Sequence, residues 1–197
     1  QEMKKLKMNE KVFGPKGILN DTTYNNSIKD QRYYNITVEQ LLRHQAGFNN
    51  YAGDPVSSTR YIMMQNHLTT PPDHKTLLKI LLKRHLGYTP GEGKCYSNLG
   101  YMILSMIIEK KSRMKYENFM QKYVLQPAGC YDMHIAGTYY KDRRPNETKY
   151  YMHQGSIPVY EYNNSGRMVE KCYGDTDLPR LSGAGAWCGS AAELSRL

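Results

Sequence analysis

The most constraining feature of this sequence is a stretch that would be apolar on nearly every face if it formed a helix. Its apolar side chains fall at helical spacing and also on the faces between: Leu99, Met102, Ile103, Met106 and Ile107, with Tyr101, Leu104 and Ile108. A helix without a polar face belongs inside a protein, surrounded by other elements. The sequence therefore predicts a domain built around a central helix over residues 99–108.

Two shorter helices are expected before this central helix. Thr37 and Gln40 form a capping-box pattern at the start of a helix that Gly47 ends. Asp73 is placed to cap a second helix, in which leucines alternate with lysines and which ends at Gly87. The alternation is typical of a surface helix with one buried face.

The pattern becomes less regular after the central helix. A further helix is predicted over 116–124 and should stop before Pro127, and Ser190 with Glu193 forms another capping box. The small residues of 181–187 would let backbone segments pass close together. Segments without helical periodicity are expected to be loops, with one turn over 61–64, or short strands: 1–35, 48–72 and 129–173.

The formal net charge is +9, but the lysines and arginines are scattered in small clusters. The sequence contains no zinc finger, ribonucleoprotein motif or basic zipper, which argues against nucleic acid as a partner. Attraction to anionic polymers or to membrane surfaces is the broader consequence of this charge. No apolar stretch approaches the roughly 20 residues of a membrane span, and no signal-peptide pattern opens the chain.

Neither a metal site nor a cofactor is predicted from the sequence. Four histidines lack the i, i+4 spacing or flanking carboxylates of a metal site, and four methionines are expected to fill the core: His67, His74, His85 and His134; Met102, Met106, Met114 and Met120. The cysteines form no C-x-x-C pair. An oxidising compartment would leave three disulfide pairings open, and free buried thiols are an equal alternative, for Cys95, Cys130, Cys172 and Cys188.

Tyr96, Ser97 and Asn98 lie between a glycine-rich turn and the central helix. A phenol, with an unperturbed pKa near ~10, acts as a base near neutral pH only if a cation or hydrogen bonds stabilise the phenolate. An asparagine two residues on can donate to a carbonyl or orient an ammonium group. Alternatively, Ser97 or Asn98 caps the helix and Tyr96 is a packed aromatic. These three residues alone do not choose between the two interpretations.

Four segments of the sequence follow one another in the order of known signatures. Thr37 to Gly47 is similar to T-x-x-x-L-L-x-H-x-S-G, and Pro90 to Tyr101 follows P-G-x-x-x-x-Y-S-N-x-G-Y. Residues 127–133 are similar to P-L-G-M-x-x-T, and residues 183–194 are similar to G-G-x-x-S-x-x-D-L. In these segments the chain resembles the serine β-lactamase and penicillin-binding-protein-like family, which includes class C β-lactamases, DD-peptidases and related esterases.

The resemblance implies an α+β fold and acyl transfer through a nucleophilic serine, without metal or organic cofactor. In the family the serine lies in an S-x-x-K motif on a helix, and the lysine shares proton transfer with the tyrosine of Y-x-N. A later K-T-G or H-x-G strand lines the opposite wall. Tyr96 matches the general acid/base position, and Asn98 matches the position that contacts substrate and lysine. A nearby lysine ammonium would lower the pKa of the tyrosine, and a base makes the serine hydroxyl nucleophilic.

Two motifs of the family have no counterpart at the right place in this chain. Nothing before residue 36 fits S-x-x-K, and Ser112 with Lys115 matches it only after Tyr-Ser-Asn, in a polar link between helices. The run from His153 to Gly155 matches H-x-G but precedes the 183–194 segment, which the family's strand motif follows. Both matches are interpreted as coincidences. His44, in the first segment, is expected to be a structural hydrogen-bonding residue.

Together these features predict one partial domain over 1–197: the mainly helical middle region of an α+β serine hydrolase, with short strands towards the C-terminus. The start at Gln1 and the helix signal interrupted at Leu197 favour a fragment that is inactive alone, since it holds one wall of an active site and no nucleophile. The parent is expected to be an extracytoplasmic bacterial enzyme that hydrolyses an amide or ester of a small molecule or peptide, such as a β-lactam or a cell-wall peptide. The alternative is a non-catalytic binding member of the same fold.

Overall fold

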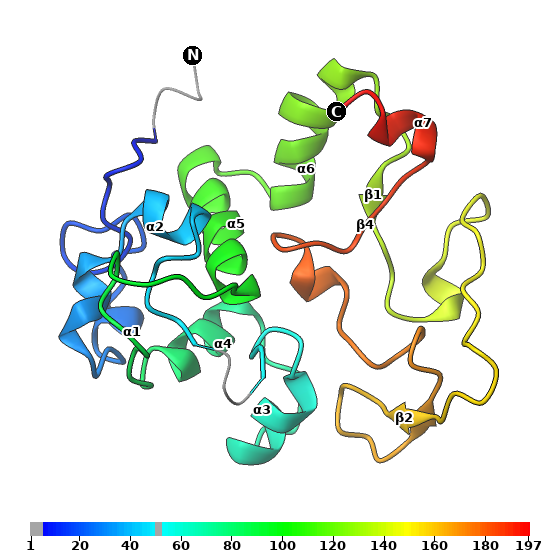
Figure 1. Cartoon of the computed structure of the whole chain (residues 1–197), viewed down its shortest axis with the longest axis horizontal. Helices are drawn as coiled ribbons and strands as arrows, with labels where there is room; N and C mark the ends of the chain where they lie inside the picture. The colour runs from blue at the N-terminus through cyan, green and yellow to red at the C-terminus, as the bar shows by residue number, and fades with distance from the viewer. Residues whose placement is uncertain (1–5, 50–52) are drawn as a thin grey trace.

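The computed structural model describes residues 6–49 and 53–197, with helices first and short strands later in the chain (Figure 1). The predicted central helix is α5 (Asn98–Ser112). Shorter helices and a 3-10 turn at Gln31–Asn35 precede it: α1 (Thr22–Asn25), α2 (Val38–Leu42), α3 (Thr59–Gln65) and α4 (His74–Leu81). The elements that follow it are α6 (Tyr116–Met120), β1 (His134–Ile135), β2 (Val159–Tyr160), β3 (Met168–Val169), β4 (Trp187–Cys188) and α7 (Ala191–Leu194). The fold is α+β, as the sequence predicted.

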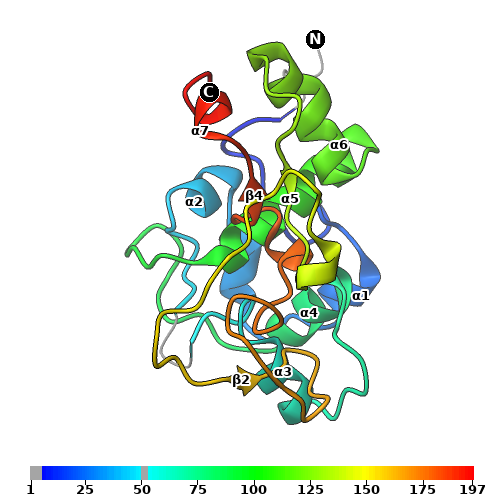
Figure 2. The same ribbon diagram turned by 90° about the vertical axis from the view of Figure 1, so that its right-hand side faces the viewer.

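The helices before α5 pack around it and form one continuous core. Figures 1 and 2 both show α5 running through the middle of the molecule. Met102, Ile103 and Ile107 of α5 are 0% exposed, which confirms the prediction of a central helix. Met106 packs against this core, whereas Met114 and Met120 are only half-buried and lie outside it. Within the described residues, no helix is both long enough and apolar enough to cross a bilayer.

The capping signals form as predicted at α2 and α4. The backbone N–H of Gln40 donates to Thr37 Oγ1 (3.3 Å), and the N–H of Thr37 donates to Gln40 Oε1 (2.9 Å). At α4, Asp73 Oδ1 accepts from the N–H of Thr76 (2.7 Å). Each bond satisfies a group that has no partner inside the helix.

Several segments are more helical than predicted. The first of the expected loops contains α1 and the 3-10 turn, and the loop expected over 48–72 contains α3; residues 1–5 and 50–52 lie outside the described residues. After α6 a π-helical turn and a 3-10 turn continue to Ala128, so the helical path passes through Pro127. Proline is tolerated there because the first residues of a helical turn need no intrahelical N–H donor.

Short strands form two antiparallel pairs in the later part of the chain, as predicted. β1 pairs with β4, with His134 opposite Cys188 and Ile135 opposite Trp187, and β2 pairs with β3. The buried apolar cluster of this region is small: Leu125, Cys130 and Met133, with Ala128 and Trp187 against it. The capping box of Ser190 and Glu193 opens α7, as predicted. All four cysteines are free thiols.

The segment around Gly183 lies directly on α5, which confirms the close approach predicted for 181–187. A Cβ added at Gly183 would lie 2.5 Å from the backbone oxygen of Tyr101 and 2.8 Å from Cβ of Ser105. No side chain fits at such distances, so only glycine allows this contact.

Arg180 joins the same segment to α3. Its Nη1 donates to Thr59 Oγ1 (3.1 Å), and its Nη2 pairs with Asp177 Oδ2 (2.8 Å). The guanidinium side chain is 5% exposed, so this pair is buried between the helical part and the C-terminal part of the chain.

Candidate active site

Tyr96 and Asn98 lie together at the N-terminal entrance of α5. The phenol of Tyr96 is 62% exposed, and its hydroxyl donates to Asn98 Oδ1 at 3.0 Å. Since the amide oxygen accepts this bond, the amide NH₂ is the group that Asn98 can offer to a carbonyl. The structure therefore brings the two predicted site residues into direct contact.

The first turn of α5 is capped by a residue from a distant loop. Ser97 occupies the N-cap position, but its side chain makes no cap bond. Instead, Asp54 Oδ2 accepts from the N–H of Asn98 (2.9 Å), while Asp54 Oδ1 accepts from the N–H of Val56 (2.9 Å). Ser97 is therefore the N-cap residue, as the capping interpretation expected, but the cap bond comes from Asp54 and the Asn98 side chain contacts Tyr96.

His44 packs against this corner and forms a hydrogen bond with its backbone. Its Nδ1 accepts from the N–H of Ser97 (3.2 Å), and its ring lies 4.7 Å from the Tyr96 ring and 5.1 Å from the Tyr101 ring. Its backbone oxygen accepts from Tyr88 OH (3.1 Å) and from the N–H of Cys95 (3.0 Å). These contacts confirm the prediction that His44 is a structural hydrogen-bonding residue.

Gly47 allows the first resemblance segment to reach the second. Its φ is +93°, and a Cβ there would lie 2.6 Å from the backbone oxygen of Tyr88. Its own carbonyl accepts from the N–H of Gly87 (2.8 Å), and the carbonyl of Gln45 accepts from the N–H of Gly91 (2.9 Å). Backbone hydrogen bonds thus join the turn 44–47 to the segment that leads to Tyr96, and these bonds position that segment.

Ser112 does not belong to this site. It ends α5, whose 15 residues span about 21 Å at ~1.5 Å per residue, so it lies a helix length from Asn98. Ser112 Oγ accepts from the N–H of Met114 (3.1 Å), and Arg113 with φ +60° breaks the helix before Lys115. The serine and the lysine of this S-x-x-K match are therefore not on one helical face.

The match from His153 to Gly155 is also outside any strand. His153 is exposed, and Gly155 lies in a turn with φ +85°. A strand that lines an active-site wall requires extended backbone, so this turn does not supply it.

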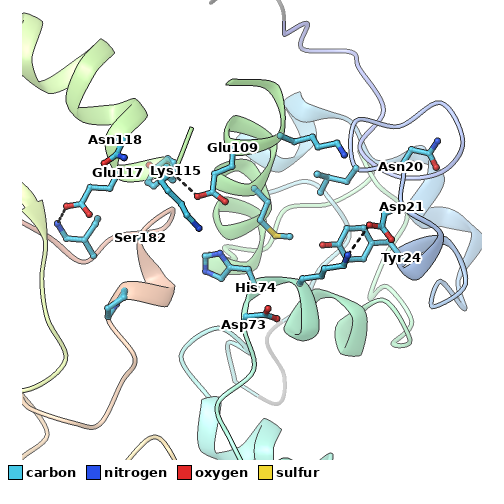
Figure 3. A pocket seen from close by; sticks show the side chains of 17 residues that line it. Asn20, Asp21, Tyr24, Asp73, His74, Glu109, Lys115, Glu117, Asn118 and Ser182 are labelled. Carbon is cyan, nitrogen blue, oxygen red and sulfur yellow. Dashed lines mark hydrogen bonds and ion pairs between the residues drawn. The ribbon is translucent and has the colours of Figure 1, made fainter. Parts of the chain in front are cut away.

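A cavity of about 860 Å³ lies away from the Tyr96 corner, between α1, α4, α5, α6 and the turn at Pro179–Leu181 (Figure 3). Figure 3 shows several carboxylates around it. Glu109 accepts from the N–H of Tyr116 (2.9 Å), Glu117 accepts from the N–H of Ile135 (2.9 Å), and Asp21 pairs with Lys75. Each of these three carboxylates is thus already bound to a backbone N–H or to a lysine. Neither Tyr96 nor Asn98 lines this cavity.

Two groups of polar residues were not anticipated from the sequence. Asp54 follows a glycine in a loop, and no local signal indicates its contact with Asn98, 44 positions away. His134, Glu147 and Cys188 converge through the pairing of β1 with β4, although their spacing fits no metal motif.

The α+β fold and the Tyr-Ser-Asn corner at the entrance of its central helix agree with the family that the sequence resembles. The model of the Beta-lactamase family matches residues 1–197, and the chain belongs to that family. The chain is therefore placed in a β-lactamase-like serine hydrolase family.

The chain is also similar to individual proteins of known name or structure. The chain is 30% identical over 105 residues, 52% of its length and 22% of the relative's, to penicillin-binding protein 4* of Bacillus subtilis (strain 168). A D-stereospecific amidohydrolase from Streptomyces sp. matches with a TM-score of 0.61 at 20% identity, over 98% of this chain and 53% of that one. A class C β-lactamase matches with a TM-score of 0.57 at 17% identity, over 100% of this chain and 43% of that one. The chain shares the fold of these structures and spans about half of their length or less.

Proposed function

We propose that Tyr96 and Asn98 form one wall of an acyl-transfer site in a serine hydrolase. The observation that carries this proposal is the exposed Tyr96 phenol, bonded to Asn98 and held in place by the His44 ring. Because an S-x-x-K motif before Tyr-Ser-Asn is not among these 197 residues, the serine and the lysine come from other residues of the gene product. The chain 1–197 then acts as part of one catalytic domain and is inactive alone.

The chemistry assigns a role to each side chain. A lysine ammonium beside Tyr96 stabilises its phenolate, and the phenolate takes the proton from the serine hydroxyl as it attacks the carbonyl. The phenol then returns this proton to the leaving nitrogen or oxygen, which leaves an acyl-serine that water hydrolyses. Asn98 donates its amide N–H to the substrate carbonyl or to an adjacent acceptor.

Small amides, peptides and esters are the proposed substrates. The similarity to a penicillin-binding protein and to a D-stereospecific amidohydrolase supports a substrate with an amide bond, such as a β-lactam or a cell-wall peptide. The same similarity supports an extracytoplasmic location in a bacterium. A binding protein of the same fold without catalysis is the second candidate, because no S-x-x-K motif precedes Tyr-Ser-Asn in these 197 residues.

Covalent labelling tests the proposal. The full-length gene product is incubated with a penicillin or a fluorophosphonate, and its intact mass is measured over time. We expect a mass increase on one serine, and Tyr96→Phe should slow the labelling about 10²- to 10⁴-fold, as expected for loss of a general base. Tyr101→Phe is the matched control, since its ring also stacks on His44 while its hydroxyl bonds the backbone of Leu42.

Three results would count against this assignment. Equal labelling rates in the Tyr96 and Tyr101 variants would remove the proton-transfer role of Tyr96. No labelling of the full-length protein by either reagent would favour the binding protein. Chain 1–197 by itself should stay unlabelled, and labelling at Ser112 would contradict the location of the nucleophile.

A further inference from the structure

Three side chains with metal-binding atoms converge at the pairing of β1 with β4. The antiparallel register places His134 directly opposite Cys188, and Glu147 arrives from the loop after β1. The ligand atoms of these residues all lie within 4.8 Å of one another. Nothing in the proposed acyl transfer uses this cluster, which lies outside the Tyr96 corner.

The imidazole of His134 is oriented as a metal ligand would be. Its Nδ1 is 2.7 Å from the backbone oxygen of Asp132, so Nδ1 carries the proton and donates it. Nε2 faces Glu147 Oε1 and is in hydrogen-bond contact with it, so the proton between these two atoms leaves when both bind a metal. A backbone carbonyl that fixes the tautomer in this way is typical of histidines bound to metals. The side chains of His134 and Glu147 are only 6% and 7% exposed.

The cluster has an open side. A cavity of about 380 Å³ is lined by all three side chains, which gives an ion an entry path and leaves room for a water ligand. Glu193 also lines it, but its carboxylate accepts from the N–H of Asp132 (2.8 Å) and from Ser190 (3.1 Å), so it serves the cap of α7.

We propose that His134, Glu147 and Cys188 bind one Zn²⁺ ion, with water as the fourth ligand. A set of one nitrogen, one oxygen and one sulfur ligand suits zinc rather than Mg²⁺ or Ca²⁺, which prefer oxygen alone. Bonds of about 2.0–2.3 Å in a tetrahedron place ligand atoms roughly 3.5 Å apart. To reach this geometry, Cys188 moves closer to the other two ligands and the contact between His134 and Glu147 opens.

We expect the ion to hold together three segments of this part of the chain. It connects β1, the loop that carries Glu147, and β4, in a region whose buried apolar cluster contains few residues. Small regions that bury little apolar surface are commonly stabilised by a metal or by disulfides, and the cysteines here are free thiols. This inference does not depend on the proposed hydrolase activity.

Metal titration of the purified chain tests the site. Co²⁺ serves as a spectroscopic substitute, because a cobalt–thiolate bond gives a charge-transfer absorption that nitrogen and oxygen ligands do not give. We expect saturation at one equivalent of Co²⁺, displacement of Co²⁺ by Zn²⁺, and a higher melting temperature with Zn²⁺. Cys188→Ser should abolish the charge-transfer band, and Glu147→Gln should weaken binding by more than the 10- to 100-fold that loss of an indirect partner causes.

Cys172→Ser is the matched control. Cys172 Sγ lies 3.8 Å from a carboxylate oxygen of Glu170 and is half-buried, so it resembles Cys188 except that it is outside the cluster. This variant should bind Co²⁺ with the wild-type spectrum. Alkylation of the unchanged chain adds a readout that needs no variant: Zn²⁺ should protect Cys188 from iodoacetamide and leave Cys172 reactive.

Several outcomes would overturn the site. These are Co²⁺ binding without a charge-transfer band, full binding by Cys188→Ser, or equal alkylation of Cys188 with and without Zn²⁺. Absence of Zn²⁺ binding by the wild-type chain would leave the cluster as a buried histidine–glutamate pair beside a thiol. Circular dichroism of the metal-free variants separates lost binding from lost folding, and Glu147→Gln keeps the shape of the side chain.

Discussion

The helical part of the chain and the part that follows α6 contain different kinds of interior. In the described residues up to α5, buried apolar side chains form one cluster that extends from Val12 to Ile107. From Leu125 onward, the corresponding cluster consists of Leu125, Cys130 and Met133. The later region buries more charged groups, with Glu161 at 2%, Arg180 at 6% and Glu193 at 6% exposure, against Asp30 at 7% in the helical part.

This difference determines what each region responds to. Apolar burial is insensitive to pH and depends on close packing, so the loss of even one methylene group lowers the free energy of unfolding. A buried charge is stable only while its partner is present and ionised. The helical part should therefore be sensitive to changes of side-chain volume, and the later part to changes of charge.

The largest effect is expected for Ile103→Ala in α5. Ile103 is 0% exposed, and its truncation should cost about 4 kcal/mol of unfolding free energy through lost burial and the cavity left behind. Ile157→Ala is the control in the later region, since Ile157 is 81% exposed and should cost less than about 0.5 kcal/mol. Urea denaturation measures both, and similar losses would mean that α5 is not the centre of the core.

The next largest effect is expected for Asp177→Asn. This change leaves the buried Arg180 guanidinium without its charge partner and should cost about 3 kcal/mol. Glu39→Gln removes the partner of Arg43 from an exposed pair and should cost about 0.5 kcal/mol or less. If both changes cost the same in chemical denaturation, the later region does not depend on its buried charges.

A smaller effect is expected for Asp30→Asn, which tests an ion pair inside the apolar region. Hydrogen bonds from the Arg32 guanidinium and the N–H of Leu86 hold the pKa of Asp30 well below its usual range. Because the folded pKa is depressed, this stabilisation is present above about pH 4 and is lost as the pH falls towards the folded pKa. Replacement should lower the free energy of unfolding by about 2 kcal/mol at pH 7. It should also reduce the loss of stability that the wild-type chain shows as the pH falls below about 4. Asp142→Asn, a change at an exposed position, should leave this loss of stability at low pH as it is in the wild-type chain.

The smallest effects are expected for the two matched capping boxes. Thr37→Ala and Ser190→Ala each remove a cap worth about 1 kcal/mol. Helix α2 belongs to the continuous core, so the first change should lower the global melting temperature. Helix α7 contributes little to a core, so the second should instead raise amide hydrogen exchange over 191–195. Equal melting shifts in both variants would show that the two regions unfold together.

Local signals explain why much of the helical part could be predicted from the sequence. Thr37 with Gln40 and Asp73 with Thr76 act over three residues, so the pattern and the bond coincide. Helix α3 could not be predicted because its N-cap residue Ser58 makes no side-chain bond; α3 is instead held by burial and by the contact of Thr59 with Arg180, far along the chain.

The same distinction holds for the candidate site. The predicted corner of Tyr96 and Asn98 depends on residues two positions apart, and the structure places their side chains in contact. Its catalytic role stays a prediction. Asp54 and the cluster of His134 with Cys188 depend on chain pairings that no local pattern encodes, so only the folded chain reveals them.

The carboxylate of Asp54 has an electrostatic consequence for substrate recognition. The start of a helix such as α5 carries a partial positive charge from its aligned peptide dipoles and ordinarily attracts anions. Asp54 already occupies this end through the N–H of Asn98. Under the proposed function, a substrate carboxylate that approached the Tyr96 corner would therefore meet a helix end whose partial charge Asp54 already offsets, and this helix end would not attract it.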